Sequence, residues 1–226
     1  MLPRVLEPEV MDTTAEAEDY DSMDHAEVNR RFVDDFLQAF GKLHQPFVSP
    51  PAIFDAGTGT AQIPIELLSR EIPFEIHAVD LSEEMLVVAR RNVEKAGFGN
   101  RIRVKPADCK ALMETSGSYD AVISNSIIHH IPEPLAVFKE CWRILKPGGL
   151  LFLRDLLRPS SEAELERLVT LYGGPHASHG AKMFRDSLWA ALTVEEVQAM
   201  AATLGIPQGS VRTTSDRHWT LEVVKT

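Results

Sequence analysis

Four polar residues, Asp55, Asp80, Asp108 and Asn125, follow short apolar runs in the first part of the 226-residue sequence. Because a short apolar run between polar segments is typical of a buried strand, each residue is predicted at the carboxyl end of a strand. The carboxyl ends of parallel strands meet at one edge of a sheet, where open α/β sheets bind their ligands. The four side chains are therefore expected to line one rim of the molecule.

The stretch FDAGTGTAQI contains the first of these acids and two glycines, Gly57 and Gly59. Glycine lets a backbone turn sharply or approach a ligand closely. A dinucleotide-binding turn has glycine at its first, third and sixth positions, but the sixth position here is Gln62. A carboxylate at Asp55 would repel a pyrophosphate and attract a cation, so the turn favours a positively charged ligand.

Asp80 adds a second constraint on that ligand. It ends the next apolar run, about twenty residues after the glycine turn. A carboxylate at this position can accept hydrogen bonds from both hydroxyls of a ribose. Asp55 and Asp80 together predict an adenosine that carries a cationic tail in place of phosphates.

The elements that must position these residues alternate between apolar runs and amphipathic stretches, which is the pattern of a doubly wound sheet. Strands are predicted at 52–55, 74–79, 102–105, 119–124 and 150–154, helices at 25–43, 61–69, 83–96 and 134–145, and two further strands at 208–215 and 218–224. The breakers Lys146-Pro147-Gly148-Gly149 are expected to end the last of these helices. The fold class is therefore an α/β, Rossmann-like, mostly parallel seven-stranded sheet with helices on both faces and an antiparallel C-terminal strand.

The remaining segments are predicted to surround that sheet. Residues 1–24 read as an acidic N-terminal arm that could act as a lid, with order expected from Tyr20 onward because Tyr20 and Met23 are apolar anchors. Residues 25–226 are predicted to form a single domain with cap elements around 160–190. Capping boxes begin helices at Ser161 and Thr193, whereas 172–181 reads as a loop.

Composition excludes several classes of protein. A formal net charge of −10 argues against a nucleic-acid surface, which depends on clustered Lys and Arg. Cys109 and Cys141 are the only two cysteines and lack metal-ligand spacing, so no metal site and no disulfide framework are predicted. No apolar stretch is long enough for a membrane span and the N-terminus lacks a secretory pattern. A cytoplasmic protein that binds neither nucleic acid nor membranes is expected.

The region from about Ala52 to Arg154 resembles the class I S-adenosylmethionine-dependent methyltransferases, specifically the small-molecule group. Asp55-Ala56-Gly57-Thr58-Gly59 is similar to the first motif of that family, with Ala61 where many members have a third glycine. Tyr119–Asn125 resembles the motif of the fourth strand, and Leu145–Leu150 resembles the turn before the fifth. The resemblance implies S-adenosyl-L-methionine as the cofactor.

The resemblance also implies which residues hold that cofactor. Asp80 would bind the ribose, Leu81 and Met85 would lie near the adenine, Asp108 would meet the adenine amino group, and Cys109 the neighbouring ring nitrogen. The cofactor-binding residues are predicted to be Asp55, Ala56, Gly57, Thr58, Gly59, Asp80, Leu81, Met85, Ala107, Asp108, Cys109 and Asn125.

The acceptor would lie beyond the fourth and fifth strands. His129 and His130 follow the fourth strand and are candidates for a general base or for acceptor contact, with packing or helix entry as the alternative. Asn125 could hydrogen-bond the acceptor and Arg154 could pair with an anionic group. Tyr20 and Met23 of the arm are the remaining acceptor-binding candidates. The polar segment 215–219 has two interpretations, recognition of a small anionic or zwitterionic acceptor and an ordinary hairpin turn, and its Ser-Asp pair slightly favours the turn.

The function predicted from these features is methyl transfer to a small-molecule acceptor by in-line displacement. A nicotinamide-dependent oxidoreductase and a methyltransferase-fold binding protein without activity are the alternatives. The sequence leaves open the acceptor, its nucleophilic atom, the need for a general base and the oligomeric state.

Overall fold

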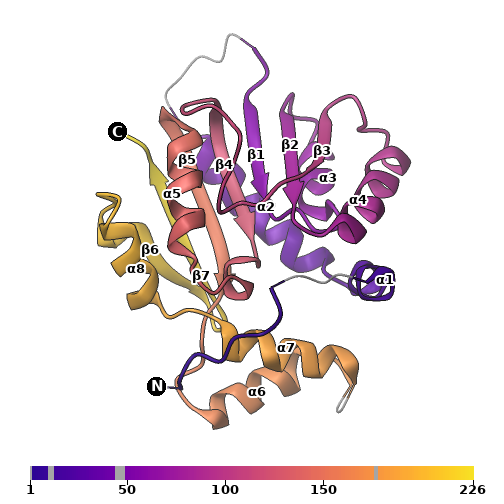
Figure 1. The fold of residues 1–226 in the computed structure, drawn as a ribbon, viewed down its shortest axis with the longest axis vertical. Coiled ribbons are helices and arrows are strands. Elements are labelled where there is room, and N and C mark those ends of the chain that lie inside the picture. Colours follow the sequence, from indigo (N-terminus) through magenta and orange to yellow (C-terminus); the bar gives the residue numbers. More distant parts are fainter. Residues whose placement is uncertain (1, 10–12, 44–48, 176–177) are drawn as a thin grey trace. The chain divides into compact units, whose positions relative to one another are not determined.

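A computed structural model describes residues 2–9, 13–43, 49–175 and 178–226. Its strands form a seven-stranded sheet in the order β3-β2-β1-β4-β5-β7-β6 (Figure 1). The pairs β1–β2, β1–β4 and β2–β3 are parallel, whereas β6 and β7 are antiparallel. The predicted fold class is therefore confirmed, because strand order reverses beside β1 as in a doubly wound sheet.

The elements follow one another along the chain with short connections. The strands are β1 (Ala52–Ala56), β2 (Glu75–Asp80), β3 (Ile102–Pro106), β4 (Tyr119–Asn125), β5 (Leu145–Leu156), β6 (Val211–Ser215) and β7 (His218–Val224). The helices are α1 (Thr14–Ser22), α2 (Ala26–Phe40), α3 (Gln62–Leu68), α4 (Glu83–Lys95), α5 (Leu135–Ile144), α6 (Glu162–Tyr172), α7 (His179–Ala190) and α8 (Val194–Ala202), with 3₁₀ turns η1 (Ile128–His130) and η2 (Gln208–Ser210). Among the described helices, none combines the length and the apolar character that crossing a bilayer requires.

The chain divides into two compact units. The larger unit comprises Val10–Asn125, Ala136–Leu153 and Glu222–Thr226, and the smaller unit comprises Met1–Glu9, Ser126–Leu135 and Arg154–Leu221. Strand β5 contributes residues to both units.

Aromatic side chains form the core of the larger unit on one face of its strands. Phe32 and Phe36 of α2 contact Phe152 of β5 at ring-centroid distances of 5.3 and 5.9 Å, and Phe40 contacts Phe74 at 5.1 Å. These rings are almost fully buried, so α2 is fixed against the sheet by its apolar stripe, as its helical spacing predicts. Helix α5 lies on the opposite face, in front of the strands in Figure 1.

The breakers before the fifth strand lie inside β5, which begins at Leu145 and not at Leu150 as predicted. The reason is pairing with the C-terminal end of the chain: Gly148 N–H donates to the Lys225 carbonyl (2.6 Å) and Lys225 N–H donates to the Gly149 carbonyl (2.9 Å). A Cβ on Gly149 would lie 2.9 Å from the Asp120 carbonyl oxygen, so a larger residue could not enter the strand there.

Two helices occupy segments in which no helix is predicted. Helix α1 occupies Thr14–Ser22, earlier than the expected onset of order at Tyr20, and begins with a capping box between Thr13 and Glu16. Helix α7 begins at His179, within the predicted loop, because the Ser178 side chain accepts a hydrogen bond from Ala181 N–H (3.1 Å). The rest of that predicted loop includes residues 176 and 177, which lie outside the described residues.

Candidate functional site

The glycine turn after β1 bends over the end of β2 in the larger unit. Gly57 and Gly59 have positive φ angles of 74° and 54°, so both require the left-handed conformation that glycine adopts without strain. Gly57 and Thr58 donate their N–H groups to the Val79 carbonyl at 2.9 and 2.8 Å. Gly59 N–H donates to Asp80 Oδ2 at 2.8 Å. The turn and the acid are therefore held together as one rim.

Asp80 is shaped to accept additional hydrogen bonds. Its Oδ1 accepts from Ser82 N–H (2.9 Å) and its Oδ2 from Gly59. A carboxylate offers about four acceptor positions, and because Leu81 N–H is a third donor, about one position remains for a ligand hydroxyl such as that of a ribose. Burial raises the pKa of Asp80, while the N–H donors of Ser82, Gly59 and Leu81 lower it.

Asp55 is a buried carboxylate whose oxygens are not both hydrogen-bonded by the described residues. It is 2% exposed, and its Oδ2 has no hydrogen-bond partner within the described ranges. Burial raises the pKa of Asp55 to about 7, and the nearby Asp80 adds to that increase. An incompletely paired buried carboxylate is stabilised by a cationic group, so this side chain fits the positive tail expected of the ligand.

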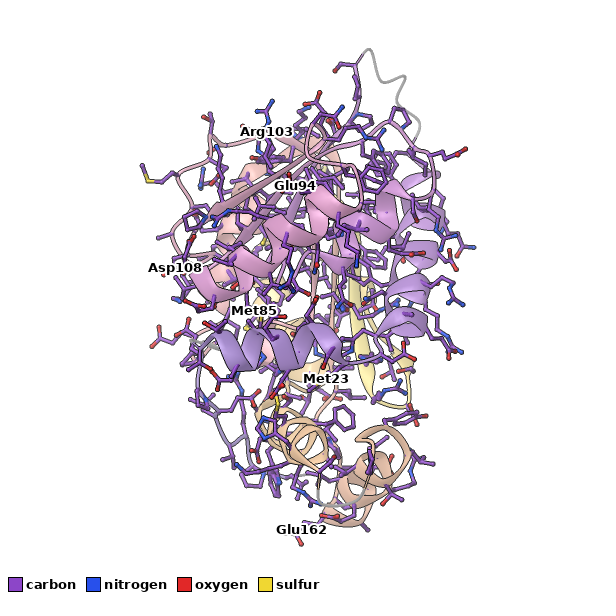
Figure 2. All side chains as sticks on the ribbon, turned by 90° about the vertical axis from the view of Figure 1, so that its right-hand side faces the viewer. Met23, Met85, Glu94, Arg103, Asp108 and Glu162 are labelled. Carbon is purple, nitrogen blue, oxygen red and sulfur yellow. The ribbon has the colours of Figure 1, made fainter. Side chains whose placement is uncertain are left out.

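Helix α1 lies beside the glycine turn. The Tyr20 ring is 3.7 Å from the place that a Cβ on Gly59 would occupy. Ala17 of α1 packs in one apolar cluster with Met85 and Val88 of α4, and Tyr20 packs against that cluster. Figure 2 shows α1 passing next to Met85, with Met23 near its end. The helix thus closes one side of the rim formed by the glycine turn.

Polar contacts hold α1 on the outer side of α4. Thr14 Oγ1 donates to Glu84 (2.7 Å), and Arg91 donates two hydrogen bonds to Glu18 (2.6 and 2.9 Å). Asp21 Oδ1 accepts from Asn92 at 2.8 Å. Sequence reasoning missed these contacts because they join residues far apart in the chain. The capping box that begins α1, which is visible in the sequence, was the available signal for this helix.

The other predicted cofactor residues lie on or near the same rim. Ala107 N–H donates to the Asp80 carbonyl at 3.0 Å, so the third strand ends beside the second. Asp108 Oδ1 accepts from the Lys110 amide (2.9 Å) and pairs with its ammonium group (3.1 Å). Cys109 is 7% exposed, and burial raises the pKa of its thiol, which therefore stays neutral.

Two further predicted side chains differ in how free they are to contact a ligand. Leu81 is 47% exposed, so its side chain can contact an apolar part of a ligand. Asn125 Oδ1 is buried without a hydrogen-bond partner within the described ranges, so it can accept from a bound molecule.

His129 belongs to a cluster in the smaller unit. Its Nδ1 lies 2.5 Å from Asp155 Oδ1, and its Nε2 lies 3.5 Å from Glu7 Oε1. Asp155 is itself held by the amides of Ile128 (2.5 Å) and His129 (3.2 Å). Burial alone would lower the pKa of His129, but the Asp155 and Glu7 carboxylates outweigh burial and raise it. Burial would raise the pKa of Asp155, and His129 reverses that effect and lowers it.

His130 faces the same glutamate. Its Nδ1 lies 3.1 Å from Glu7 Oε1. Burial lowers the pKa of His130 to about 3, with a further decrease from His129, so its ring is neutral near pH 7. Burial raises the pKa of Glu7. Glu7 is a residue that the sequence placed only in an acidic arm, and no local pattern distinguishes it from the other acids there.

Arg154 and the segment 215–219 take part in contacts within the smaller unit. Arg154 is 6% exposed, and its Nε donates to Thr220 Oγ1 at 2.9 Å. Asp216 accepts from Tyr172 (3.0 Å) and Arg167 (3.2 Å), and Arg217 stacks on the Tyr172 ring at 3.5 Å. The segment 215–219 is therefore a hairpin turn fixed to α6, in agreement with the second of its two interpretations.

Comparison with known proteins finds a methyltransferase domain in the larger part of the sheet region. Residues 54–153 match the model of a methyltransferase domain. A ubiquinone biosynthesis O-methyltransferase of Xanthomonas axonopodis pv. citri (strain 306) is 30% identical over 158 residues, which are 66% of this chain and 65% of that protein. The chain thus spans somewhat less than two thirds of the length of the curated relatives it matches.

Solved structures show the same fold. A candidate S-adenosyl-L-methionine-dependent methyltransferase from Methanococcus maripaludis superimposes with a TM-score of 0.70 at 20% identity, covering 98% of this chain and 97% of the other. A SAM-dependent methyltransferase from Aquifex aeolicus gives 0.63 at 16% identity, with 93% and 97% covered. The domain match and the sheet order agree: residues 54–153 carry a methyltransferase domain, and the chain has the class I fold of the S-adenosyl-L-methionine-dependent methyltransferases.

Proposed function

We propose that this protein transfers the methyl group of S-adenosyl-L-methionine to a small-molecule acceptor. The match to a methyltransferase domain supports the reaction, and the names of the relatives, ubiquinone biosynthesis O-methyltransferases, support a small acceptor. The net charge of −10 also argues against a nucleic-acid acceptor. The family match further favours this cofactor over a nicotinamide dinucleotide.

The observation that carries the proposal is the rim of the larger unit. Asp80 accepts three backbone amides, that of Gly59 among them, and retains about one acceptor position for the ribose. Asp55 presents a buried oxygen without a partner among the described residues. We propose that Asp55 faces the cationic part of the cofactor, and that Met85, Leu81 and Asp108 surround the adenine. Ala56, Gly57, Thr58, Ala107, Cys109 and Asn125 are proposed to complete the cofactor site.

The bound cofactor supplies an electrophilic methyl group on a positively charged sulfur. Held by Asp55 and Asp80, the cofactor would offer that methyl carbon to an acceptor lone pair, with sulfur as the leaving group. The task of the protein is to align the acceptor with that bond and to exclude water. We propose that α1, through Tyr20 and Met23, covers the site during transfer.

His129 and His130 remain the proposed acceptor-side imidazoles, and Arg154 the proposed anion partner. A base role for His129 would require Glu7 to move, because Glu7 Oε1 lies 3.5 Å from Nε2, the nitrogen that is not bonded to Asp155. If Arg154 pairs with an anionic group of the acceptor, its guanidinium has to bind that group in addition to Thr220 Oγ1. Positioning alone is sufficient where the acceptor arrives deprotonated.

The test combines binding with activity profiling. Calorimetry with S-adenosylhomocysteine and with NAD should show binding of the first and much weaker binding of the second. Incubation with a methyl-labelled donor and a metabolite extract should yield a labelled small molecule that mass spectrometry can identify. Tighter binding of the dinucleotide would overturn the cofactor assignment, and cofactor binding without transfer to any acceptor would favour a binding protein.

A further inference from the structure

Glu7, His129 and His130 converge in the smaller unit although the glutamate is far from the histidines in sequence. Each offers one ligand atom, and the three atoms lie within 4.8 Å of one another. Glu7 Oε1 is 3.5 Å from His129 Nε2 and 3.1 Å from His130 Nδ1. All three side chains are largely buried, with exposed fractions of 12%, 4% and 19% respectively.

These separations fit the ligand shell of a small metal ion. Zinc is bound tetrahedrally by imidazole nitrogen and carboxylate oxygen at about 2.0–2.2 Å, which places neighbouring ligand atoms about 3.3 Å apart. The two distances from Glu7 Oε1 lie on either side of that value. Both Glu7 Oε1 and His130 Nδ1 are also buried without a hydrogen-bond partner within the described ranges, so their proximity is not explained by a hydrogen bond between them.

A second layer of contacts orients two of the three ligands, His129 and Glu7. Asp155 binds His129 Nδ1 at 2.5 Å, which directs Nε2 toward Glu7. Ser187 Oγ donates to Glu7 Oε2 at 3.3 Å, which leaves Oε1 facing the imidazoles. A carboxylate behind a ligating histidine is the usual outer partner at protein metal sites.

The segment that carries Glu7 is itself held in place. The Arg4 guanidinium donates to the carbonyls of Ala190 (2.7 Å), Ile131 (2.9 Å) and His129 (3.1 Å). Val5 N–H donates to the Trp189 carbonyl at 3.0 Å. The glutamate therefore reaches the histidines in a preformed geometry, and metal binding would not have to order a free tail.

We propose that Glu7, His129 and His130 bind a divalent first-row transition metal such as Zn²⁺. Two imidazoles and one carboxylate suit Zn²⁺, Co²⁺ or Ni²⁺ and are a poor set for Mg²⁺ or Ca²⁺, which prefer oxygen ligands. Three protein ligands leave a fourth position for water or a small molecule. A cavity of about 250 Å³ adjoins Glu7 and is lined by Leu6, Asp186 and Trp189 among others. This site does not depend on the proposed methyl transfer.

The rival explanation is a proton shared within the cluster. A protonated His129 could donate from Nε2 to Glu7 while Nδ1 donates to Asp155, and this arrangement needs no metal. Metal binding releases such a proton, because a ligating imidazole must be neutral. The two explanations are separated by adding metal to the metal-free protein.

The experiment uses the full chain without an affinity tag, stripped of metal by a chelator. Calorimetry should show one equivalent of Zn²⁺ bound, with Mg²⁺ showing none. Glu7→Gln and His130→Gln should each weaken Zn²⁺ binding at least tenfold, and Asp155→Asn about tenfold or more through the orientation of His129. The exposed His179→Gln and Glu162→Gln variants of the same unit serve as matched controls and should bind as the parent does.

A spectroscopic measurement keeps the proposal testable if a variant fails to fold. X-ray absorption of the Zn²⁺-loaded parent protein should report two imidazole ligands, and Co²⁺ should give the visible absorption of a four-coordinate ion. Hydrogen exchange of residues 2–9 should also slow when Zn²⁺ is added. The absence of Zn²⁺ binding to the parent, binding unchanged in both Glu7→Gln and His130→Gln, or a spectrum without imidazole ligation would each overturn the proposal in favour of the shared proton.

Discussion

At the scale of single residues, the two acids of the larger unit have different environments and therefore different roles. Asp80 is tied to backbone amides on both oxygens, whereas Asp55 keeps one buried oxygen without a partner among the described residues. Burial raises the pKa of both acids: the amide hydrogen bonds partly offset this effect at Asp80, whereas the pKa of Asp55 rises to about 7. Both residues were predicted from the sequence, but their difference in environment was not.

Replacing Asp80 tests the proposed ribose contact. Asp80→Ala should weaken S-adenosylhomocysteine binding by about 2 kcal/mol, roughly 30-fold, because charge-assisted hydrogen bonds would be lost. The exposed Glu75 at the amino end of the same strand is the matched control, and Glu75→Ala should leave affinity unchanged. Isothermal titration of both variants measures the effect, and equal affinities for Asp80→Ala and parent would contradict the assignment.

Replacing Asp55 tests the cost of a buried carboxylate. The pKa of Asp55 is about 7 in the folded chain and 3.8 in a model peptide. At pH values between the two, the chain binds a proton when it folds, so the free energy of unfolding falls as pH rises from about 4 to 7. Asp55→Asn removes that loss and should raise the free energy of unfolding at pH 8 by on the order of 3 kcal/mol. Urea denaturation at pH 8 and pH 4 should show the gain only at pH 8.

The same substitution should weaken cofactor binding. An ionised Asp55 is expected to attract the cationic tail, so the affinity of the parent should rise on the order of tenfold between pH 6 and pH 7.5. Asp55→Asn should bind more weakly at pH 7.5 and lose this dependence. A variant that binds as tightly as the parent at both pH values would show that Asp55 does not face the cation.

At the scale of elements, helix periodicity and caps were predicted more reliably than segment boundaries. Thr193 begins α8 with a full capping box, as its sequence pattern indicates, and Ser82 caps α4. At Ser161 only the Ser161 side of the predicted box is present, as a bond from Glu164 N–H. The prediction of a turn at Lys146–Gly149 was wrong, because this segment forms hydrogen bonds with the C-terminal end of the chain and is part of β5. Local propensity cannot anticipate a partner strand so far along the chain.

Removing the cap of α1 tests whether this helix closes the proposed site. Thr13→Ala deletes the capping box and should destabilise α1 by about 1 kcal/mol, which speeds its amide exchange roughly fivefold. Cofactor affinity should fall by a similar factor if α1 covers the cofactor. Hydrogen exchange with mass spectrometry resolves α1 from the rest of the chain.

The matched control is the second capping box of the chain. Thr193→Ala removes the same interactions from α8, which belongs to the smaller unit. Its effect on exchange should be confined to α8 and leave α1 unchanged. Unaltered cofactor affinity in Thr13→Ala, despite faster exchange of α1, would rule out the lid.

At the scale of the whole molecule, strand β5 contributes residues to both units, and its last residues belong to the smaller one. Its last residues include Asp155, which is fully buried against His129. Removing one partner of a buried ion pair leaves an uncompensated charge and is strongly destabilising. The integrity of the smaller unit should therefore depend on this pair.

Asp155→Asn should lower the free energy of unfolding of the metal-free protein by about 3–5 kcal/mol at pH 6. The pKa of Asp155 is lowered and the pKa of His129 is raised. The ion pair therefore stabilises the fold at pH values that lie between these two pKa values. The contribution is lost as pH falls through the pKa of Asp155 and as pH rises through the pKa of His129. Denaturation across this range should show the largest difference from the parent near pH 6, with the partly exposed Asp216→Asn as control.

The sequence by itself determined the class of the sheet, its strands and the residues of the proposed cofactor rim, whereas the strand order came from the structure. These features depend on residues a few positions apart, such as a glycine turn directly after an apolar strand, and on parallel strands whose carboxyl ends must coincide. Only the tertiary structure brought Glu7 to His129 and His130, placed α1 beside Gly59 and paired Lys225 with Gly148. The physical reason is that such contacts form between segments with no shared periodicity, where burial and hydrogen bonding in the folded chain select the partners.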